Sequence, residues 1–345
     1  MMKATIFVEP GKMAIQDIEK PEINGPDQAI IRVVRASVCG SDLWWYRGIS
    51  DKEKGSTAGH EAIGVVEEVS EDVKNIKAGD FVIVPFTHGC GHCAACKAGF
   101  DGDCLTHSAG SSSFQAEYIR YVSANWALVK IPGQPEDYSD DMLKSFQTLS
   151  DVMATGFHAA KTAEVKAGDT VVVMGDGAVG LCGVIGAKLL GAKRIIAMSR
   201  HEDRQQLALE FGATDIVAER GEEAVNKIMG MTEAGADAVL ECVGTKESIE
   251  TAVKVGRPGA IVGRVGVPHI DELDTNSLFW RNIGFRGGVA AVTTHDRELL
   301  LDAVLKGEIN PGKVFNKQFD LDDVQAAYAA MDERIAIKSL LVLGN

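Results

Sequence analysis

The stretch VVVMGDGAVGLCGVIGAKLLGA, residues 171–192, decides the fold of half of this chain. It opens as an apolar strand and continues with a pattern typical of a helix, and GxGxxG lies between the two. In that context the first glycine allows a tight turn, the second admits a pyrophosphate, and the third lets the helix pack closely with its N-terminus facing the anion. We therefore expect this loop to bind a dinucleotide through Gly175, Gly177, Ala178, Val179 and Gly180.

Short apolar runs alternate with helical stretches from about Lys144 onward, which predicts a doubly wound parallel sheet. The helical stretches include 179–191 and 204–212. The expected strands are 170–175, 194–199, 215–219, 237–244, 259–266 and 285–290.

The first hundred residues have a different pattern, in which strands are separated by Gly, Pro and Asp turns. The expected strands are 3–8, 28–37, 61–70 and 80–86. After about Ala291 we expect helices at 297–309 and 322–331 and a final strand at 339–344 that returns to the first domain. The sequence thus predicts a β-rich catalytic domain at 1–153, a nucleotide-binding domain at 154–291, and a return to the catalytic domain at 292–345.

Four of the seven cysteines lie in THGCGHCAACKAGFDGDC, residues 87–104. No export signal is visible in MMKATIFVEPG, and no apolar run reaches the about 18 residues of a membrane span, so we expect a cytoplasmic chain with reduced thiols. The spacing of Cys90, Cys93, Cys96 and Cys104 resembles thiolate zinc loops; a redox CxxC pair or small buried residues remain alternatives. Four thiolates leave zinc no open position, so the chemistry must lie elsewhere.

Composition narrows the class of partner. The chain has 345 residues, 46% of them apolar and 24% charged, which is ordinary for a globular protein of two domains. Its formal net charge of −14 and the lack of a basic patch disfavour nucleic acids and anionic membranes. Small-molecule partners are therefore expected.

The residues about 20 positions after the glycine loop bear on the choice of cofactor. The strand ends in Ser199 and Arg200, where an acidic residue would otherwise bind the adenosine ribose. A hydroxyl and an arginine suit a 2′-phosphate, so we expect NADP(H) to be preferred over NAD(H). Arg204 is a candidate helper, although it also fits a solvated helix residue, as Arg200 also fits a surface charge.

Cys39 in ASVCGSD, and His60 with Glu61 in TAGHEAIGVVEEVS, are unremarkable singly. In combination with the cysteine loop, SDVMATGFHA at 150–159 and the glycine fingerprint, the chain resembles the zinc-dependent medium-chain alcohol dehydrogenases over its whole length. The resemblance implies a GroES-like catalytic domain beside a Rossmann domain, two zinc ions per chain, and a homodimer or homotetramer. It implies a catalytic zinc held by Cys39, His60 and Asp151, with Glu61 beside the metal.

Three further residues near Cys39 receive roles. The resemblance makes the Ser41 hydroxyl the first proton carrier, and Asp42 is either the partner of the His60 ring N–H or a plain turn residue. Trp44 stands where many relatives carry a histidine and cannot accept a proton, so we expect it to narrow the substrate pocket or to pack in the core. The resemblance also places Phe86 in the substrate pocket.

These observations favour a zinc-dependent oxidoreductase that transfers hydride between NADP(H) and an alcohol/carbonyl pair. A polyol or amino-alcohol (threonine-type) dehydrogenase is the alternative within the family. A zinc-ribbon nucleic-acid module is disfavoured by the acidic charge, and a catalytically silent NADP-binding zinc protein by the presence of Cys39, His60 and Asp151.

Overall fold

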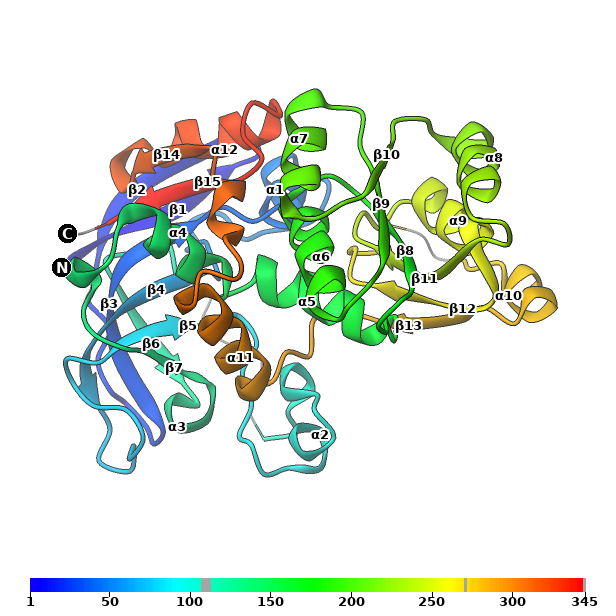
Figure 1. Ribbon diagram of the computed structural model, residues 1–345. Helices are drawn as coiled ribbons and strands as arrows, with labels where there is room; N and C mark the ends of the chain where they lie inside the picture. The colour runs from blue at the N-terminus through cyan, green and yellow to red at the C-terminus, as the bar shows by residue number, and fades with distance from the viewer. Residues whose placement is uncertain (107–112, 270–271, 344–345) are drawn as a thin grey trace. The chain divides into compact units, whose positions relative to one another are not determined.

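The computed structural model describes residues 1–106, 113–269 and 272–343 (Figure 1). The chain forms two compact units: Met1–Asp151 with Ala291–Asn345, and Val152–Ala290. Within the described ranges, no helix has the length and apolar character needed to cross a membrane.

The unit formed by Val152–Ala290 contains a six-stranded parallel sheet in the order β10-β9-β8-β11-β12-β13. Apolar, often β-branched strand residues such as Val172, Ile196 and Val239 fill its core. This order is that of a Rossmann sheet, so the predicted doubly wound fold is confirmed. The strands are β8 (Thr170–Met174), β9 (Arg194–Met198), β10 (Asp215–Val217), β11 (Ala236–Glu241), β12 (Gly256–Arg264) and β13 (Gly284–Gly287), and the helices are α5 (Val152–Thr162), α6 (Ala178–Leu189), α7 (Glu202–Phe211), α8 (Gly221–Met231), α9 (Lys246–Val255) and α10 (Thr275–Arg281).

All six expected strands of this sheet end one to three residues earlier than the sequence predicted, and the structure gives the reason at two of them. The strand expected at 215–219 ends at Val217, which pairs with the last residue of β9 and has no longer neighbour to follow. The strand expected at 285–290 ends at Gly287, whose φ of +110° takes the backbone out of the extended region. Both expectations were wrong at their C-terminal ends.

The other unit is built on a seven-stranded, mostly antiparallel sheet in the order β14-β15-β3-β4-β5-β7, with β6 paired to β3, and on a separate β1–β2 hairpin. Its strands are β1 (Met2–Glu9), β2 (Lys12–Ile18), β3 (Gln28–Ser37), β4 (Ala62–Val69), β5 (Phe81–Val84), β6 (Tyr118–Val122), β7 (Val129–Ile131), β14 (Lys317–Asp320) and β15 (Ser339–Val342). Its α-helices are α1 (Asp42–Tyr46), α2 (Ala94–Lys97), α3 (Ala124–Ala127), α4 (Asp140–Thr148), α11 (Thr294–Leu305) and α12 (Val324–Asp332), and its 3₁₀ turns are Asp101–Asp103, Pro135–Asp137, Pro311–Val314 and Leu321–Asp323.

The C-terminal segment completes this sheet. The strand expected at 339–344 is β15, which ends at Val342; Gly344 lies outside the described residues. The helix expected at 297–309 is α11, which begins earlier because Thr293 caps it by accepting a hydrogen bond from the Asp296 backbone at 3.1 Å. It ends before Gly307, whose φ is +72°. The helix expected at 322–331 is α12.

Candidate active site and metal centres

Strand register gathers the candidate catalytic residues at one edge of the larger sheet. The strand pairings join Ser37 of β3 to Leu340 of β15, and Ala36 of β3 to Ala62 of β4. Cys39 follows β3 by two residues, His60 and Glu61 directly precede β4, and Lys338 directly precedes β15. Residues far apart in the sequence therefore meet because the end of β3 and the starts of β4 and β15 lie at the same edge of the sheet.

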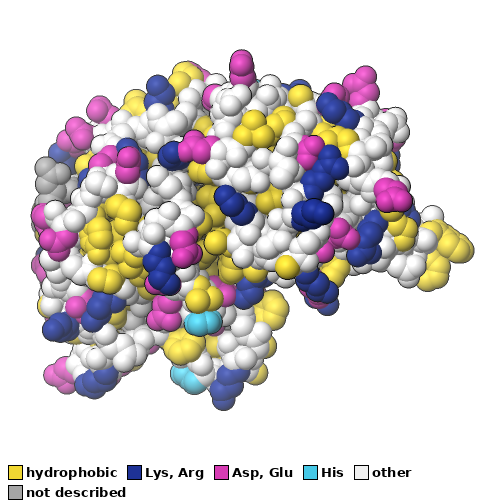
Figure 2. Space-filling model, in the orientation of Figure 1, with side chains coloured by type: hydrophobic (Ala, Val, Ile, Leu, Met, Phe, Trp, Pro, Cys, Tyr) yellow, Lys and Arg dark blue, Asp and Glu magenta, His cyan; other side chains and the backbone are white. Residues whose placement is uncertain are grey.

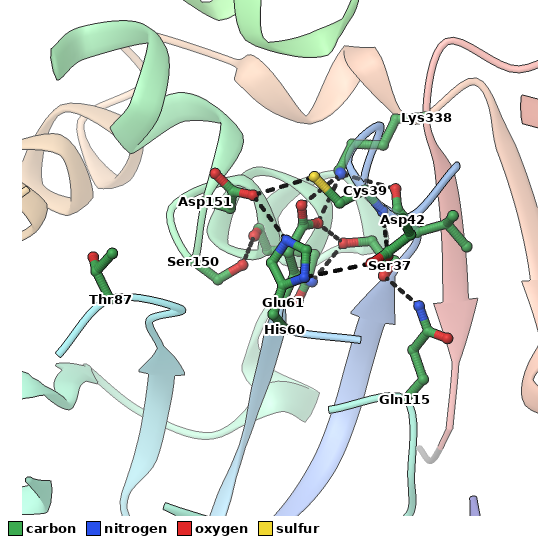
Figure 3. Close-up of polar contacts among 12 residues, drawn as sticks. Ser37, Cys39, Asp42, His60, Glu61, Thr87, Gln115, Ser150, Asp151 and Lys338 are labelled. Atoms are coloured by element: carbon green, nitrogen blue, oxygen red, sulfur yellow. Dashed lines mark hydrogen bonds and ion pairs between the residues drawn. The ribbon is translucent and has the colours of Figure 1, made fainter. Parts of the chain in front are cut away.

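Cys39, His60, Glu61 and Asp151 form one cluster, in which each residue offers a ligand atom within 4.8 Å of the others (Figure 3). The Asp151 Oδ2 atom lies 3.5 Å from the Cys39 Sγ and 3.4 Å from the His60 Nε2. Asp151 lies between α4 and α5, whereas the other three members of the cluster flank strands of the sheet. The structure thus brings together all three residues predicted to hold the catalytic metal.

Gly59 lets the chain turn tightly before His60. Its φ is +90°, and an added Cβ would lie 2.8 Å from the Gln115 backbone nitrogen and closer still to the Gln115 side chain. No side chain fits there, so the glycine fixes where the His60 ring enters the cluster.

Asp42 contacts two residues of the cluster, His60 and Cys39. Its Oδ1 lies 3.6 Å from the His60 Nδ1, and its Oδ2 accepts a hydrogen bond from the Cys39 backbone at 3.0 Å. With Nδ1 facing Asp42, the Nε2 of His60 faces Cys39 and Asp151. This is the arrangement expected of an imidazole that ligates a metal through Nε2.

The pKa shifts in the cluster arise from burial and from the ionisable groups lying close to one another. Burial raises the pKa of the Cys39 thiol, and the Asp151 carboxylate adds to that rise. Burial opposes ionisation of Asp151, yet the hydrogen bond and charge of His60 hold the pKa of Asp151 below its usual value. Burial also opposes protonation of His60, but Cys39 and Asp42 raise its pKa well above 6.5. A thiolate, an imidazole and a carboxylate match the ligand preferences of Zn²⁺, so these residues fit the metal.

Glu61 is paired with a buried cation that the sequence analysis missed. The Lys338 Nζ donates to the Glu61 carboxylate at 2.8 Å and to the Val38 carbonyl at 3.0 Å, and each side chain is 1% exposed. Ser37 also donates to Glu61 and itself accepts from the Gln147 amide at 2.9 Å. Burial still raises the pKa of Glu61, although Lys338 opposes that rise. The sequence did contain a signal for Lys338, because it is the one charged residue in the apolar run IAIKSLLV.

The four loop cysteines converge separately, with their sulfur atoms within 4.8 Å of one another. The Cys93 Sγ lies 3.5 Å from the Cys96 Sγ and 3.9 Å from the Cys104 Sγ. Burial raises the pKa of Cys96 to about 12, whereas hydrogen bonds from Thr106 and nearby backbone amides outweigh burial at Cys90 and lower its pKa to about 6. Four sulfur atoms at this spacing fit a tetrahedral thiolate zinc site.

A buried arginine lies close to the start of this loop. Arg297 of α11 is 1% exposed and donates to the Thr87 hydroxyl at 2.9 Å and to the Val292 carbonyl at 2.7 Å.

Trp126 contacts the cysteine loop at two points. Its indole donates to the Asp101 carboxylate at 3.0 Å, and it covers Gly91, where an added Cβ would enter the indole ring. Trp126 therefore packs on the cysteine loop.

The glycine loop has the conformation that its sequence predicted. Gly175 has a φ of +107°, and a Cβ on Gly180 would lie 2.0 Å from the Gly175 carbonyl oxygen. Gly177 caps α6 and meets no atom within 4 Å of an added Cβ, so its face is open. Ser199 is buried at the end of β9, Arg200 is exposed, and Arg204 lies on α7. Ser199 and Arg204 both contact Asp176, the second residue of the loop.

The remaining predicted residues lie around Cys39 and His60. Ser41 and Trp44 are half-buried at and within the short helix α1. The Phe86 ring lies 5.8 Å from the His60 ring, edge to face. Trp45, the residue after Trp44, is partly buried and packs against Phe7 and Tyr328.

Comparison with known proteins agrees with this geometry. Residues 25–133 match the model of the alcohol dehydrogenase GroES-like domain, and residues 178–306 match that of the zinc-binding dehydrogenases. An alcohol dehydrogenase from Cupriavidus necator is 31% identical, over 95% of this chain and 94% of that protein. The chain belongs to the zinc-dependent alcohol dehydrogenase family.

Two further members are similar over nearly their full lengths. An NADP-dependent isopropanol dehydrogenase from Thermoanaerobacter brockii is 31% identical, over 96% of this chain and 97% of that protein. The solved alcohol dehydrogenase of Thermus sp. ATN1 superposes with a TM-score of 0.90 at 29% identity, covering 99% of this chain and 100% of that one. This alcohol dehydrogenase family member is a zinc-dependent oxidoreductase that uses a nicotinamide cofactor to interconvert an alcohol and a carbonyl compound.

Replacing Lys338 with Met should destabilise the protein by about 3 kcal/mol, because Glu61 would keep a buried charge without its cation. Urea denaturation measures the free energy of unfolding. Lys317→Met, at an exposed position on β14, is the control and should change stability by less than about 0.5 kcal/mol. Adding Glu61→Gln to Lys338→Met should recover part of the lost stability. Equal free energies of unfolding for Lys338→Met and Lys317→Met would refute the pairing.

Proposed function

We propose that Cys39, His60 and Asp151 hold the catalytic zinc of this alcohol dehydrogenase. The supporting observation is the convergence of the Cys39 and His60 ligand atoms on the Asp151 Oδ2 at 3.5 and 3.4 Å, in a buried cluster. Three protein ligands leave a fourth position for substrate, as catalytic zinc sites require. Glu61 lies within the same cluster, and Lys338 neutralises it, so that Glu61 does not add a full unpaired charge beside the metal.

Zinc, when bound, supplies a Lewis acid that polarises an alcohol or carbonyl oxygen. The chain's own residues orient the His60 ligand and exchange a proton with the substrate. Asp42 fixes the His60 ring with Nε2 toward the cluster, and the Ser41 hydroxyl, at the start of α1, is proposed as the first group to exchange a proton with the substrate oxygen. Trp44 has no proton acceptor, so a relay that begins at Ser41 would end in water or in another group.

We further propose that Trp44 and Phe86 line the substrate pocket. Phe86 contacts the imidazole of His60, and its backbone donates to the Ser150 carbonyl at 3.3 Å, which ties it to the residue before Asp151. Trp44 is half-buried one helical turn from Ser41. Aromatic faces at these positions favour small apolar alcohols and carbonyl compounds over polyols.

A second zinc ion is assigned to Cys90, Cys93, Cys96 and Cys104. The four sulfur atoms leave no open coordination position, so this ion would stiffen the loop without contributing to the reaction.

The preferred cofactor is proposed to be NADP(H). Ser199 directly follows β9, where an acidic residue would bind an unphosphorylated ribose, and the exposed Arg200 comes next. The guanidinium group offers a 2′-phosphate a bidentate, charge-assisted contact. The NADP-dependent isopropanol dehydrogenase similar to this chain supports the same preference.

An oligomer, either a homodimer or a homotetramer, is proposed on the basis of an exposed apolar patch. Phe279 and Trp280 of α10 are 71% and 74% exposed. Figure 2 shows a patch of yellow, hydrophobic atoms in the region where Figure 1 draws α10. Strand β13, the next strand after α10, is an edge of the six-stranded sheet. An apolar patch beside an unpaired strand edge is a typical site for contact with a second copy.

Elemental analysis tests the two metal sites. We expect two zinc ions per chain in the wild type and one in each of the matched variants Cys39→Ser and Cys96→Ser. Only Cys39→Ser should abolish turnover, by about 10³-fold or more, because only its zinc contacts substrate. Cys96→Ser should instead lower the melting temperature. Full turnover in Cys39→Ser, or an unchanged zinc count, would refute the assignment.

The ratio of kcat/KM for NADPH to that for NADH tests the cofactor preference. It should exceed one in the wild type, and Arg200→Ala should lower kcat/KM for NADPH by about tenfold with little effect on NADH. Arg220→Ala, at the start of α8, serves as a charge-matched control. A wild-type ratio below one would show that NAD(H) is preferred.

Light scattering tests the oligomer. The wild type should have a mass of at least twice the 36.8 kDa of one chain, and Phe279→Ser with Trp280→Ser should shift it toward the monomer. Leu299→Ser, which removes another exposed apolar side chain, should leave the mass unchanged. A monomeric wild type would refute the proposal.

A further inference from the structure

Asp176, the second residue of the glycine loop, contacts Ser199 and Arg204, two of the side chains that could bind a 2′-phosphate. The Ser199 hydroxyl donates to its Oδ2 at 2.7 Å, and the Arg204 Nη1 lies 3.3 Å from its Oδ1 and 3.3 Å from its backbone carbonyl oxygen. The Arg204 and Asp176 side chains are only 13% and 15% exposed. Water therefore screens this ion pair less than it screens a surface pair.

The strand register explains why Asp176 reaches this position. Strands β8 and β9 are parallel neighbours, and Met174 pairs with Met198, the last residue of each strand. The loops that follow both strands leave the same edge of the sheet, which places Asp176 beside Ser199. In Rossmann folds the residue at the end of the second strand binds the adenosine ribose. Here β9 supplies a hydroxyl, and the loop after β8 supplies the carboxylate.

This carboxylate has opposite effects on the two nicotinamide cofactors. An unphosphorylated ribose presents hydroxyl groups, which can donate hydrogen bonds to a carboxylate. A 2′-phosphate carries a charge near −2 and would be repelled by Asp176, which also neutralises Arg204 and engages the hydroxyl of Ser199. A 2′-phosphate can use these two groups only after Asp176 has released them.

We infer that Asp176 is a specificity-determining residue that restrains the preference for NADP(H) by withholding Ser199 and Arg204 from the 2′-phosphate. The inference deepens the proposed cofactor preference and rests on the same site. Arg200, which is exposed, remains available to the phosphate, so the residue moderates the preference rather than reversing it. Removing the carboxylate should therefore increase selectivity for the phosphorylated cofactor.

Two ligands that differ only in the 2′-phosphate isolate this effect from catalysis: adenosine 2′,5′-bisphosphate and adenosine 5′-monophosphate. Calorimetric titration of the intact enzyme gives the ratio of their affinities. Asp176→Asn should raise this ratio by about tenfold, because a charge-assisted competitor of the phosphate is lost. Asp203→Asn removes the same charge from an exposed position in the first turn of α7 and should leave the ratio unchanged.

A second variant tests the release of Arg204. In Asp176→Asn combined with Arg204→Gln, most of the gain in the ratio should disappear, because the freed guanidinium group is what captures the phosphate. An unchanged ratio in Asp176→Asn, with the monophosphate still bound, would overturn the inference. So would an equal change for Asp203→Asn, or a gain that survives the loss of Arg204. The wild-type ratio by itself tests the preference for NADP(H), so the two proposals can fail separately.

Discussion

Neutralising buried charge is the constraint that shapes the catalytic unit. A thiol, an imidazole and two carboxylates lie within 4.8 Å of one another, and three of the four residues are buried. Uncompensated charges at such positions cost several kcal/mol each, so cations must come with them. Lys338 provides one beside Glu61, and a divalent metal, held by Cys39, a neutral His60 and Asp151, would provide the other. Asp42, Ser37 and Gln147 then fix the orientations that this balance requires.

The sequence predicted what is local and missed what depends on register. The glycine loop was predictable because turn, phosphate contact and helix packing all involve residues 175–180. The ligands Cys39, His60 and Asp151 were expected only through family resemblance, since nothing in their spacing brings them together. Lys338 pairs with Glu61 across 277 positions, through the alignment of β15 with β3 and β4, which one sequence does not reveal. Asp176 was overlooked because it occupies a variable position of the motif.

The two proposed metal sites are connected through a short segment of chain. Phe86 contacts His60 at one end, and Cys90 belongs to the thiolate loop at the other. Between them, Thr87 accepts a hydrogen bond from the buried Arg297, whose own position is fixed by the Val292 carbonyl. Residues 86–90 therefore join the cysteine loop to the Phe86 ring. A displacement of that loop would also displace the contact between Phe86 and His60. A metal that never meets the substrate can in this way influence the shape of the pocket.

The insertion of β15 between β14 and β3 bears on how the protein is made. A ribosome releases Cys39, His60 and Asp151 well before Lys338, and the whole of Val152–Ala290 emerges in between. Domains generally fold as units during synthesis. The Rossmann unit is contiguous and can fold on emergence, whereas in the first 151 residues Glu61 lacks its counter-ion until Lys338 has been synthesised. Completion of the reaction centre thus depends on a residue that is synthesised after the whole Rossmann unit.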